Sequence, residues 1–234
     1  MKTTTVLFCW FIIIYVFTIS CKHTPETKPD PPTPSPPVVC DPDTVYFTNA
    51  ILPMINSSCA KSGCHDAVSH QDGVILIDYT SIIINGEIEA YNPGDSKLYE
   101  VITENDPDKI MPPPPTNPLS SSQISQIFQW ISQGAKNNAC NETVCDSVNV
   151  TYSLTINPLM TNYCSGCHNS VTASANINLS NHPGVVAAID GGRFMGAVLQ
   201  EPGFIPMPQN SNRLTECNIG KLRKWIVDGK PNNK

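Results

Sequence analysis

Cys164-Ser165-Gly166-Cys167-His168 places two thiols and an imidazole within five residues of a chain that is 234 residues long. A second segment, Cys59-Ala60-Lys61-Ser62-Gly63-Cys64-His65, ends in the same Gly-Cys-His but holds four residues between its cysteines instead of two. Thiols and imidazoles at such short spacing are typical of metal sites and cofactor attachment sites. We therefore expect the chemistry of the protein to lie at these two segments.

The shorter segment has the Cys-x-x-Cys-His pattern of covalent haem attachment. Its thiols can add to the two vinyl groups of haem, and the histidine that follows then faces the iron. We predict that Cys164 and Cys167 hold a haem c and that His168 is an axial ligand of its iron. The longer segment predicts a second covalent haem c, held by the equivalent residues Cys59, Cys64 and His65.

A zinc site or a plain disulfide is the alternative reading of these cysteines. Structural zinc takes four protein ligands, usually from two such pairs in one module. Each segment supplies one pair and one histidine, and the sequence has no second Cys-x-x-Cys or His-x-x-x-His to complete a tetrahedral set. The ligand count therefore favours haem.

The two segments belong to an internal repeat. Before the segments the offset is 105 residues, which pairs Cys40, Phe47, Ile51, Pro53 and Cys59 with Cys145, Tyr152, Ile156, Pro158 and Cys164. After them the offset is 103, and near the end Trp130 and Gly134 match Trp225 and Gly229 at 95. Repeat units of about 100 residues have the size of a small domain. We predict two tandem modules, residues 40–140 and 141–234.

Two methionines are candidates for the second axial position of each iron. Met111 precedes four prolines and Met207 lies between Pro206 and Pro208, so both sit in stiff loops. A thioether is a soft, neutral ligand that favours ferrous iron and raises the reduction potential. The alternative is that each methionine fills a gap in the core, as most methionines do.

The hydrophobic spacing predicts helices at the end of each module. Buried-face spacing is found at Ile124, Ile127, Phe128 and Ile131, and again at Ile219, Leu222 and Ile226. Ser120 with Gln123 predicts a capping box, Thr215 a second cap, and Gly134 and Gly229 the ends of these helices. Further helices are expected at 45–56 and 151–162, bent at their prolines. No segment alternates apolar and polar residues strongly enough to indicate a β-strand, so the expected fold class is all-α.

The order of these motifs resembles a class I cytochrome c domain, and is most similar to the planctomycete-type domains of bacterial lipoproteins. The resemblance runs from about Cys40 to the C-terminus and is carried by Cys164–His168 and Ile205-Pro206-Met207-Pro208. It implies covalent haem c, ligation of each iron by histidine and methionine, and one-electron transfer. The four-residue gap between Cys59 and Cys64 departs from the usual pattern and resembles a variant seen in some multihaem cytochromes.

The N-terminus is expected to direct export. Residues 1–20 have one early charge and a long apolar run, as in a secretory signal peptide. The sequence Thr18-Ile19-Ser20-Cys21 resembles a bacterial lipobox, which implies cleavage before Cys21 and lipid on its sulfur. An uncleaved anchor helix is the alternative. Residues 21–39 are rich in proline and predict an extended tether from the lipid membrane.

Four further cysteines remain, and they allow three disulfide pairings. Cys40 and Cys145 occupy equivalent starts of the two repeats, so we favour Cys40–Cys140 and Cys145–Cys217. Cys140–Cys145 with Cys40–Cys217 is the alternative. His182 aligns with Tyr79 and is expected to take the packing role of that tyrosine.

The net charge and the cysteine count exclude some classes of protein. A net charge of -6 argues against a nucleic-acid protein, and ten cysteines argue for a compartment outside the reducing cytosol. We expect an electron carrier without enzymatic activity, periplasmic or associated with the outer membrane, whose partners are redox proteins. A dihaem cytochrome c peroxidase-like enzyme is one alternative, and a disulfide-rich surface lipoprotein without haem is another.

Overall fold

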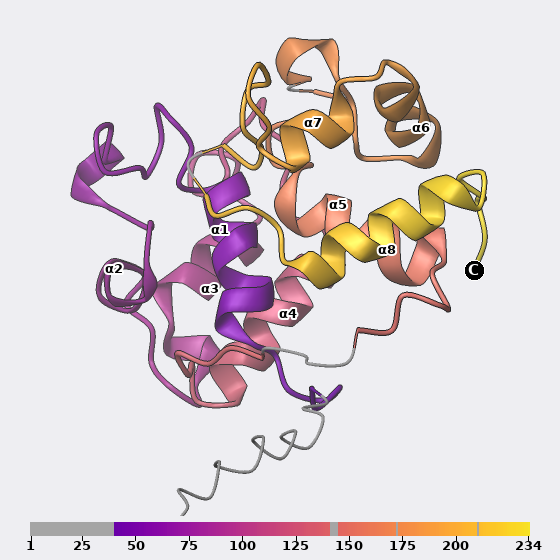
Figure 1. The fold of residues 1–234 in the computed structure, drawn as a ribbon. Helices are drawn as coiled ribbons and strands as arrows, with labels where there is room; N and C mark the ends of the chain where they lie inside the picture. Colours follow the sequence, from indigo (N-terminus) through magenta and orange to yellow (C-terminus); the bar gives the residue numbers. More distant parts are fainter. Residues whose placement is uncertain (1–39, 141–144, 172, 210) are drawn as a thin grey trace, which may run out of the picture. The chain divides into compact units, whose positions relative to one another are not determined.

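The computed structural model describes residues 40–140, 145–171, 173–209 and 211–234 (Figure 1). These residues lie within one compact unit. Their regular elements are all helical, with no strand in these ranges, so the expected all-α class is confirmed. No helix among them is long and apolar enough to cross a membrane. The expected signal peptide, Cys21 and the tether lie outside the described residues.

Apart from η3, which has no counterpart among the described residues, the helices follow the same order in the two halves of the chain. The first half contains η1 (Phe47–Ile51), α1 (Leu52–Ser58), η2 (Gln71–Gly73), α2 (Tyr79–Asn85), η3 (Pro93–Asp95), α3 (Lys97–Thr103) and α4 (Ser121–Ser132). The second half contains η4 (Tyr152–Ile156), α5 (Asn157–Tyr163), η5 (Ser174–Asn176), α6 (His182–Asp190), α7 (Phe194–Val198) and α8 (Glu216–Val227). Thus α5 to α8 stand at positions equivalent to α1 to α4.

The helices that lead into the cysteine segments change from π to α geometry near a proline. Pro53 lies at the start of α1, directly after the π-helical turn η1, and Pro158 lies at the start of α5 after η4. Proline has no N–H to donate to the carbonyl four residues earlier, so a regular α-helix cannot run through it. The expected bend at each proline is therefore a change of helix type.

The last helix of each half is capped as expected. Ser120 and Gln123 form a capping box at the start of α4, and Thr215 accepts a hydrogen bond from the N–H of Asn218 in α8. The buried face of α4 differs from the expected one, because Trp130 is fully buried whereas Phe128 is 47% exposed. Phe128 instead lies against Tyr99 of α3, with ring centroids 5.5 Å apart.

Each half has its own cluster of buried side chains. The ring of Trp130 packs on Phe47 with centroids 5.5 Å apart, and that of Trp225 packs on Tyr152 at 5.8 Å. These pairs occupy equivalent positions of the repeat. The module boundary at residue 140 stays a prediction, because residues 141–144 lie outside the described ranges.

A third ring completes each cluster. Tyr79 stands edge-on to Phe47 and donates a hydrogen bond to the Ala135 carbonyl at 2.9 Å. His182 stands edge-on to Tyr152, and its Nε2 donates to the Lys230 carbonyl at 2.9 Å. A carbonyl oxygen can only accept, so the imidazole acts here as the tyrosine hydroxyl does. His182 therefore takes the packing role that its alignment predicts.

The structure contains the disulfides Cys40–Cys140 and Cys145–Cys217, the pairing that we favoured. Each joins the start of one half to a position at or beyond the start of its last helix. Neither bond crosses from one half to the other. The two halves are therefore held together by non-covalent contacts and by the peptide chain between them.

Helices α1 and α5 pack directly on each other. Ser57 Oγ donates to the carbonyl of Asn162 at 3.0 Å, and the Tyr163 hydroxyl donates to the carbonyl of Asn49 at 3.0 Å. Asn49 is the residue whose carbonyl receives no N–H from Pro53. Three residues beyond the end of α5, Gly166 lies so close to α1 that a Cβ there would stand 1.9 Å from the carbonyl oxygen of Ser57.

This close approach predicts that Gly166→Ala destabilises the protein. The added methyl group meets backbone atoms of α1, which cannot rotate away, so the two helices must separate. We expect the free energy of unfolding in urea to fall by about 1–3 kcal/mol, the usual cost of overpacking.

Gly220→Ala is the matched control, because a Cβ at this α8 position meets nothing within 4 Å. Alanine is favoured over glycine in a helix by up to about 1 kcal/mol, so this variant should be at least as stable as the parent. Equal stability of Gly166→Ala and the parent protein would contradict the packing argument.

Candidate cofactor site

A cavity of about 490 Å³ in the second half is lined by Cys164, Cys167, His168 and Met207. Its volume falls in the range of small-molecule and cofactor pockets. Apolar side chains make much of the remaining wall, among them Ile177, Leu179, Phe194, Val198 and Phe204. The structure thus brings together the two cysteines, the histidine and the methionine that the sequence singled out in this half.

The imidazole of His168 is oriented by the backbone. Its Nδ1 lies 3.0 Å from the carbonyl oxygen of Ser174, and the residue is 8% exposed. Because a carbonyl oxygen only accepts, Nδ1 carries the proton and Nε2 keeps a lone pair. A histidine that binds a metal through one nitrogen commonly donates the other N–H in this way. The ring is therefore set up to coordinate through Nε2.

The histidine of the first half is held in the same manner. His65 Nδ1 donates to the carbonyl of Val74 at 3.3 Å. The carbonyls of His65 and His168 each accept an N–H, from Leu76 at 2.9 Å and from Leu179 at 2.7 Å. These two leucines are equivalent in the repeat. Both histidines consequently have a fixed backbone and a fixed tautomer.

The first cysteine of each segment continues the preceding helix. The N–H of Cys59 donates to Ile55 and that of Cys164 to Met160, at 2.7 and 2.9 Å. Although each residue keeps some exposed surface, its sulfur is enclosed by protein, and this burial raises the pKa of both thiols to about 12. The surroundings favour a neutral sulfur. The sulfur of a thioether is neutral and meets that condition.

Each candidate methionine is anchored by its own backbone. The N–H of Met207 donates to the carbonyl of Ala197 at 3.0 Å, and that of Met111 donates to Val101 at 2.8 Å. Both contacts join the methionine loop to α7 or α3, at equivalent positions of the repeat. Met207 shares a cavity with His168, whereas the grouping of Met111 with His65 rests on the repeat.

One wall of the second-half cavity comes from the first half. Its residues are Pro53, Asn56, Ser57, Ala60, Lys61 and Ser62. The Cys167 thiol lies 3.7 Å from the carbonyl oxygen of Ser57, and Lys61 Nζ donates to the carbonyl of Gly166 at 3.3 Å. Sequence reasoning missed this wall because a repeat alignment compares the halves and does not show how they touch.

Another part of the lining carries a cation that stacks on an aromatic ring. The Arg193 guanidinium lies over the ring of Phe204, 5.3 Å from its centroid. Gly196 allows this ring to approach, because a Cβ there would meet ring atoms at 2.5 Å. A positive charge therefore stands in this part of the lining, which the motifs did not predict.

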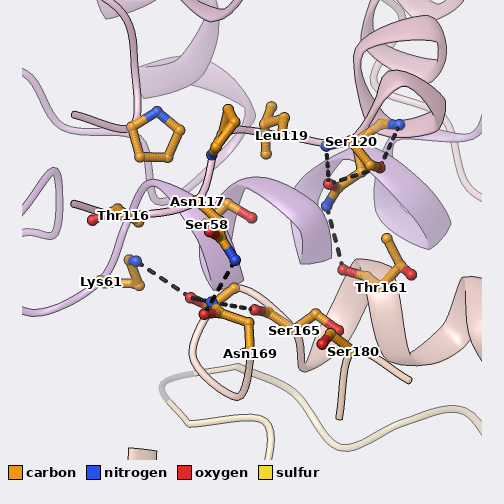
Figure 2. Close-up of a pocket in the computed structure, with 14 residues that line it drawn as sticks. Ser58, Lys61, Thr116, Asn117, Leu119, Ser120, Thr161, Ser165, Asn169 and Ser180 are labelled. Carbon is orange, nitrogen blue, oxygen red and sulfur yellow. Dashed lines mark hydrogen bonds between the residues drawn. The ribbon is translucent and has the colours of Figure 1, made fainter. Parts of the chain in front are cut away.

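A second cavity, of about 420 Å³, lies along the seam between the halves (Figure 2). Gln123 Nε2 donates across the seam to the carbonyl of Thr161 at 3.3 Å. Asn117 Nδ2 donates to Asn169 Oδ1 at 3.5 Å. Figure 2 draws both of these contacts, so hydrogen bonds join the two halves at this cavity.

The four cysteines that we predict to attach haem are free thiols in the structure. Within the described ranges, no group of three or more histidine, cysteine, aspartate or glutamate side chains is placed to hold a bare metal ion.

Residues 62–115 match the family model of planctomycete cytochrome C. The matched stretch contains Cys64, His65 and Met111, so it falls on the half with the longer cysteine gap. No curated protein and no solved structure matches the chain. The family match supports a cytochrome c-type haem protein, a class whose covalent haem serves electron transfer.

The raised pKa of the buried thiols predicts how haem-free protein reacts. If Cys59 and Cys164 titrate near pH 12, their alkylation rate should rise about tenfold per pH unit from pH 8 to 11, because only the thiolate reacts. Mass spectrometry of the two cysteine peptides measures the rates.

Urea-unfolded protein is the control, since its thiols should reach full reactivity near pH 9. Because folding raises the pKa of these thiols, they contribute to the free energy of unfolding. This contribution is complete below pH 9 and is lost as the pH rises towards 12. A plateau near pH 9 in folded protein would refute the assigned burial.

Proposed function

We propose that this protein is an exported, membrane-tethered dihaem c-type cytochrome that carries single electrons between redox partner proteins. One observation carries the proposal: Cys164, Cys167, His168 and Met207 line a single, largely apolar cavity. The match of residues 62–115 to a cytochrome c family model supports the same chemistry in the other half.

The residues of the second half fit a covalently bound haem. Cys164 supplies an enclosed sulfur and Cys167 a partly buried one, and burial raises the pKa of both thiols, which favours their neutral form. His168 presents a lone pair on Nε2 because its Nδ1–H donates a hydrogen bond to the carbonyl of Ser174. Met207 supplies a thioether from the same cavity. Bound haem would provide a one-electron centre that cycles between ferric and ferrous iron. The chain itself holds and orients the group and excludes water from it.

An axial methionine on each iron fits an electron carrier better than an enzyme. A peroxidase needs an open or displaceable position at one iron, whereas Met207 and Met111 would fill it. The thioether also favours the ferrous state and raises the reduction potential. We therefore propose no substrate turnover at either iron.

The first half supports a second haem through equivalent backbone contacts. His65 Nδ1–H donates a hydrogen bond to the carbonyl of Val74, as His168 Nδ1–H donates to the carbonyl of Ser174. Met111 is tied to α3 as Met207 is tied to α7. We propose that Cys59 and Cys64 form thioethers across a loop of four residues.

The cellular setting is inferred from the sequence and the disulfides. Two disulfides are typical of an oxidising compartment. With the apolar N-terminal run, a lipid on Cys21 and the proline-rich tether, they point to the periplasmic face or the outer membrane. The net charge of -6 favours basic surfaces on the redox partners.

The haem count tests this function directly. The intact mass of exported protein should exceed that of the polypeptide and lipid by two haems, and the denatured protein should stain for haem. Replacing Cys164 and Cys167 with serine should remove one haem, and replacing Cys59 and Cys64 should remove the other. Colourless protein without added haem mass would leave only the lipoprotein reading.

The axial ligands predict a spectroscopic change. Met207→Ala and Met111→Ala should each abolish the methionine–iron absorption band of one haem and lower its reduction potential. Met195→Ala is the control, because this α7 methionine does not line the cavity, and its spectrum should match the parent. A full-strength methionine–iron band in Met207→Ala would show that the assigned ligand is wrong.

A further inference from the structure

The four-residue loop of the first segment extends into the other half of the protein. Ala60, Lys61 and Ser62 of this loop all line the cavity that holds Cys164, Cys167 and His168. The loop of the second segment has only Ser165 and Gly166 between its cysteines, and nothing in it corresponds to Lys61. The longer gap therefore places a cation in the lining of the neighbouring site.

Lys61 is held in place across the seam. Its ammonium donates to the carbonyl of Gly166, between the two cysteines of the second segment, at 3.3 Å. Figure 2 shows this side chain pointing from the first half towards the loop of Ser165 and Asn169. The side chain is half-buried, and its charge acts on the neighbouring sulfur by lowering the pKa of Cys167, which burial otherwise raises. Lys61 thus has one defined partner beside the second attachment site.

We propose that Lys61 of the first half belongs to the haem site of the second half, where its charge raises the reduction potential of that haem. The inference rests on the proposed function. Reduction adds one electron to the iron and no proton, so a nearby fixed cation stabilises the ferrous form. The effect is larger in a partly buried site than in water, because the effective dielectric constant is lower.

Lys61 would act through its charge as a positioning residue, since it would ligate neither iron. Its charge also reaches Cys59 of its own segment, where burial raises the pKa of the thiol and Lys61 lowers it, so the potential of the second-half haem has to be measured separately.

The test is a redox titration of full-length, haem-loaded protein, followed by its visible spectrum. Lys61→Gln should lower the potential of the second-half haem by up to about 59 mV, a change of up to tenfold in the reduction equilibrium. Lys61→Arg keeps the charge and should keep the potential. Lys136→Gln removes the same charge from an exposed position that lines neither cavity, and should leave the potential unchanged.

The haem that responds is identified by a variant with serine at Cys59 and Cys64, in which only the second-half haem remains. Lys61→Gln should lower its potential there as well. If Lys61→Gln does not accumulate, Lys61→Met removes the charge, keeps the apolar stem and carries the same expectation.

Two results would overturn the inference. The first is that the second-half haem has the same potential in Lys61→Gln as in Lys136→Gln. The second is that Lys61→Arg lowers this potential as much as Lys61→Gln does, which would assign the effect to packing. Either could occur in a protein that carries two haems, in which case the proposed function stands. Protein without haem would instead overturn the proposed function.

Discussion

The close contact of α1 with α5 determines where the candidate sites lie. Both helices run directly into a Cys…Cys-His segment, so the packing of Gly166 against the Ser57 carbonyl brings the two segments together. Hydrogen bonds from Ser57 and Tyr163 hold the same pair of helices. Any larger residue at Gly166 would separate the helices and move both cysteine segments. The geometry of each site is therefore set partly by the other half of the chain.

Much of the fold could be predicted because its signals are local. The Ser120–Gln123 box, the Thr215 cap and the prolines of α1 and α5 act within one helical turn. Phe128 was wrongly expected in the core, since helical spacing defines a broad face and does not say which edge of it is covered. The favoured disulfide pairing was predicted from the repeat, because Cys40 and Cys145 occupy equivalent positions in it. The repeat spans most of the chain, yet it can be found from the sequence alone.

The candidate site was predicted in part. The motif singled out Cys164, Cys167 and His168, and the repeated proline-flanked methionines singled out Met207, which lines the same cavity. The wall supplied by Pro53 and Lys61 could not be predicted, because contacts between halves depend on backbone shape and a small residue at Gly166, which leave no periodic pattern. The second axial ligand of the first half remains a prediction from the repeat.

The order of the cysteines along the chain has a consequence for biogenesis. A polypeptide that emerges N-terminus first exposes Cys40, Cys59 and Cys64 well before Cys140, the final partner of Cys40. In an oxidising compartment the nearest thiols meet first, so premature bonds within the first hundred residues compete with the native one. Capture of Cys59 and Cys64 by a porphyrin would take them out of this competition. Maturation would then depend on timing as well as on stability, with the prosthetic group arriving before oxidation is complete.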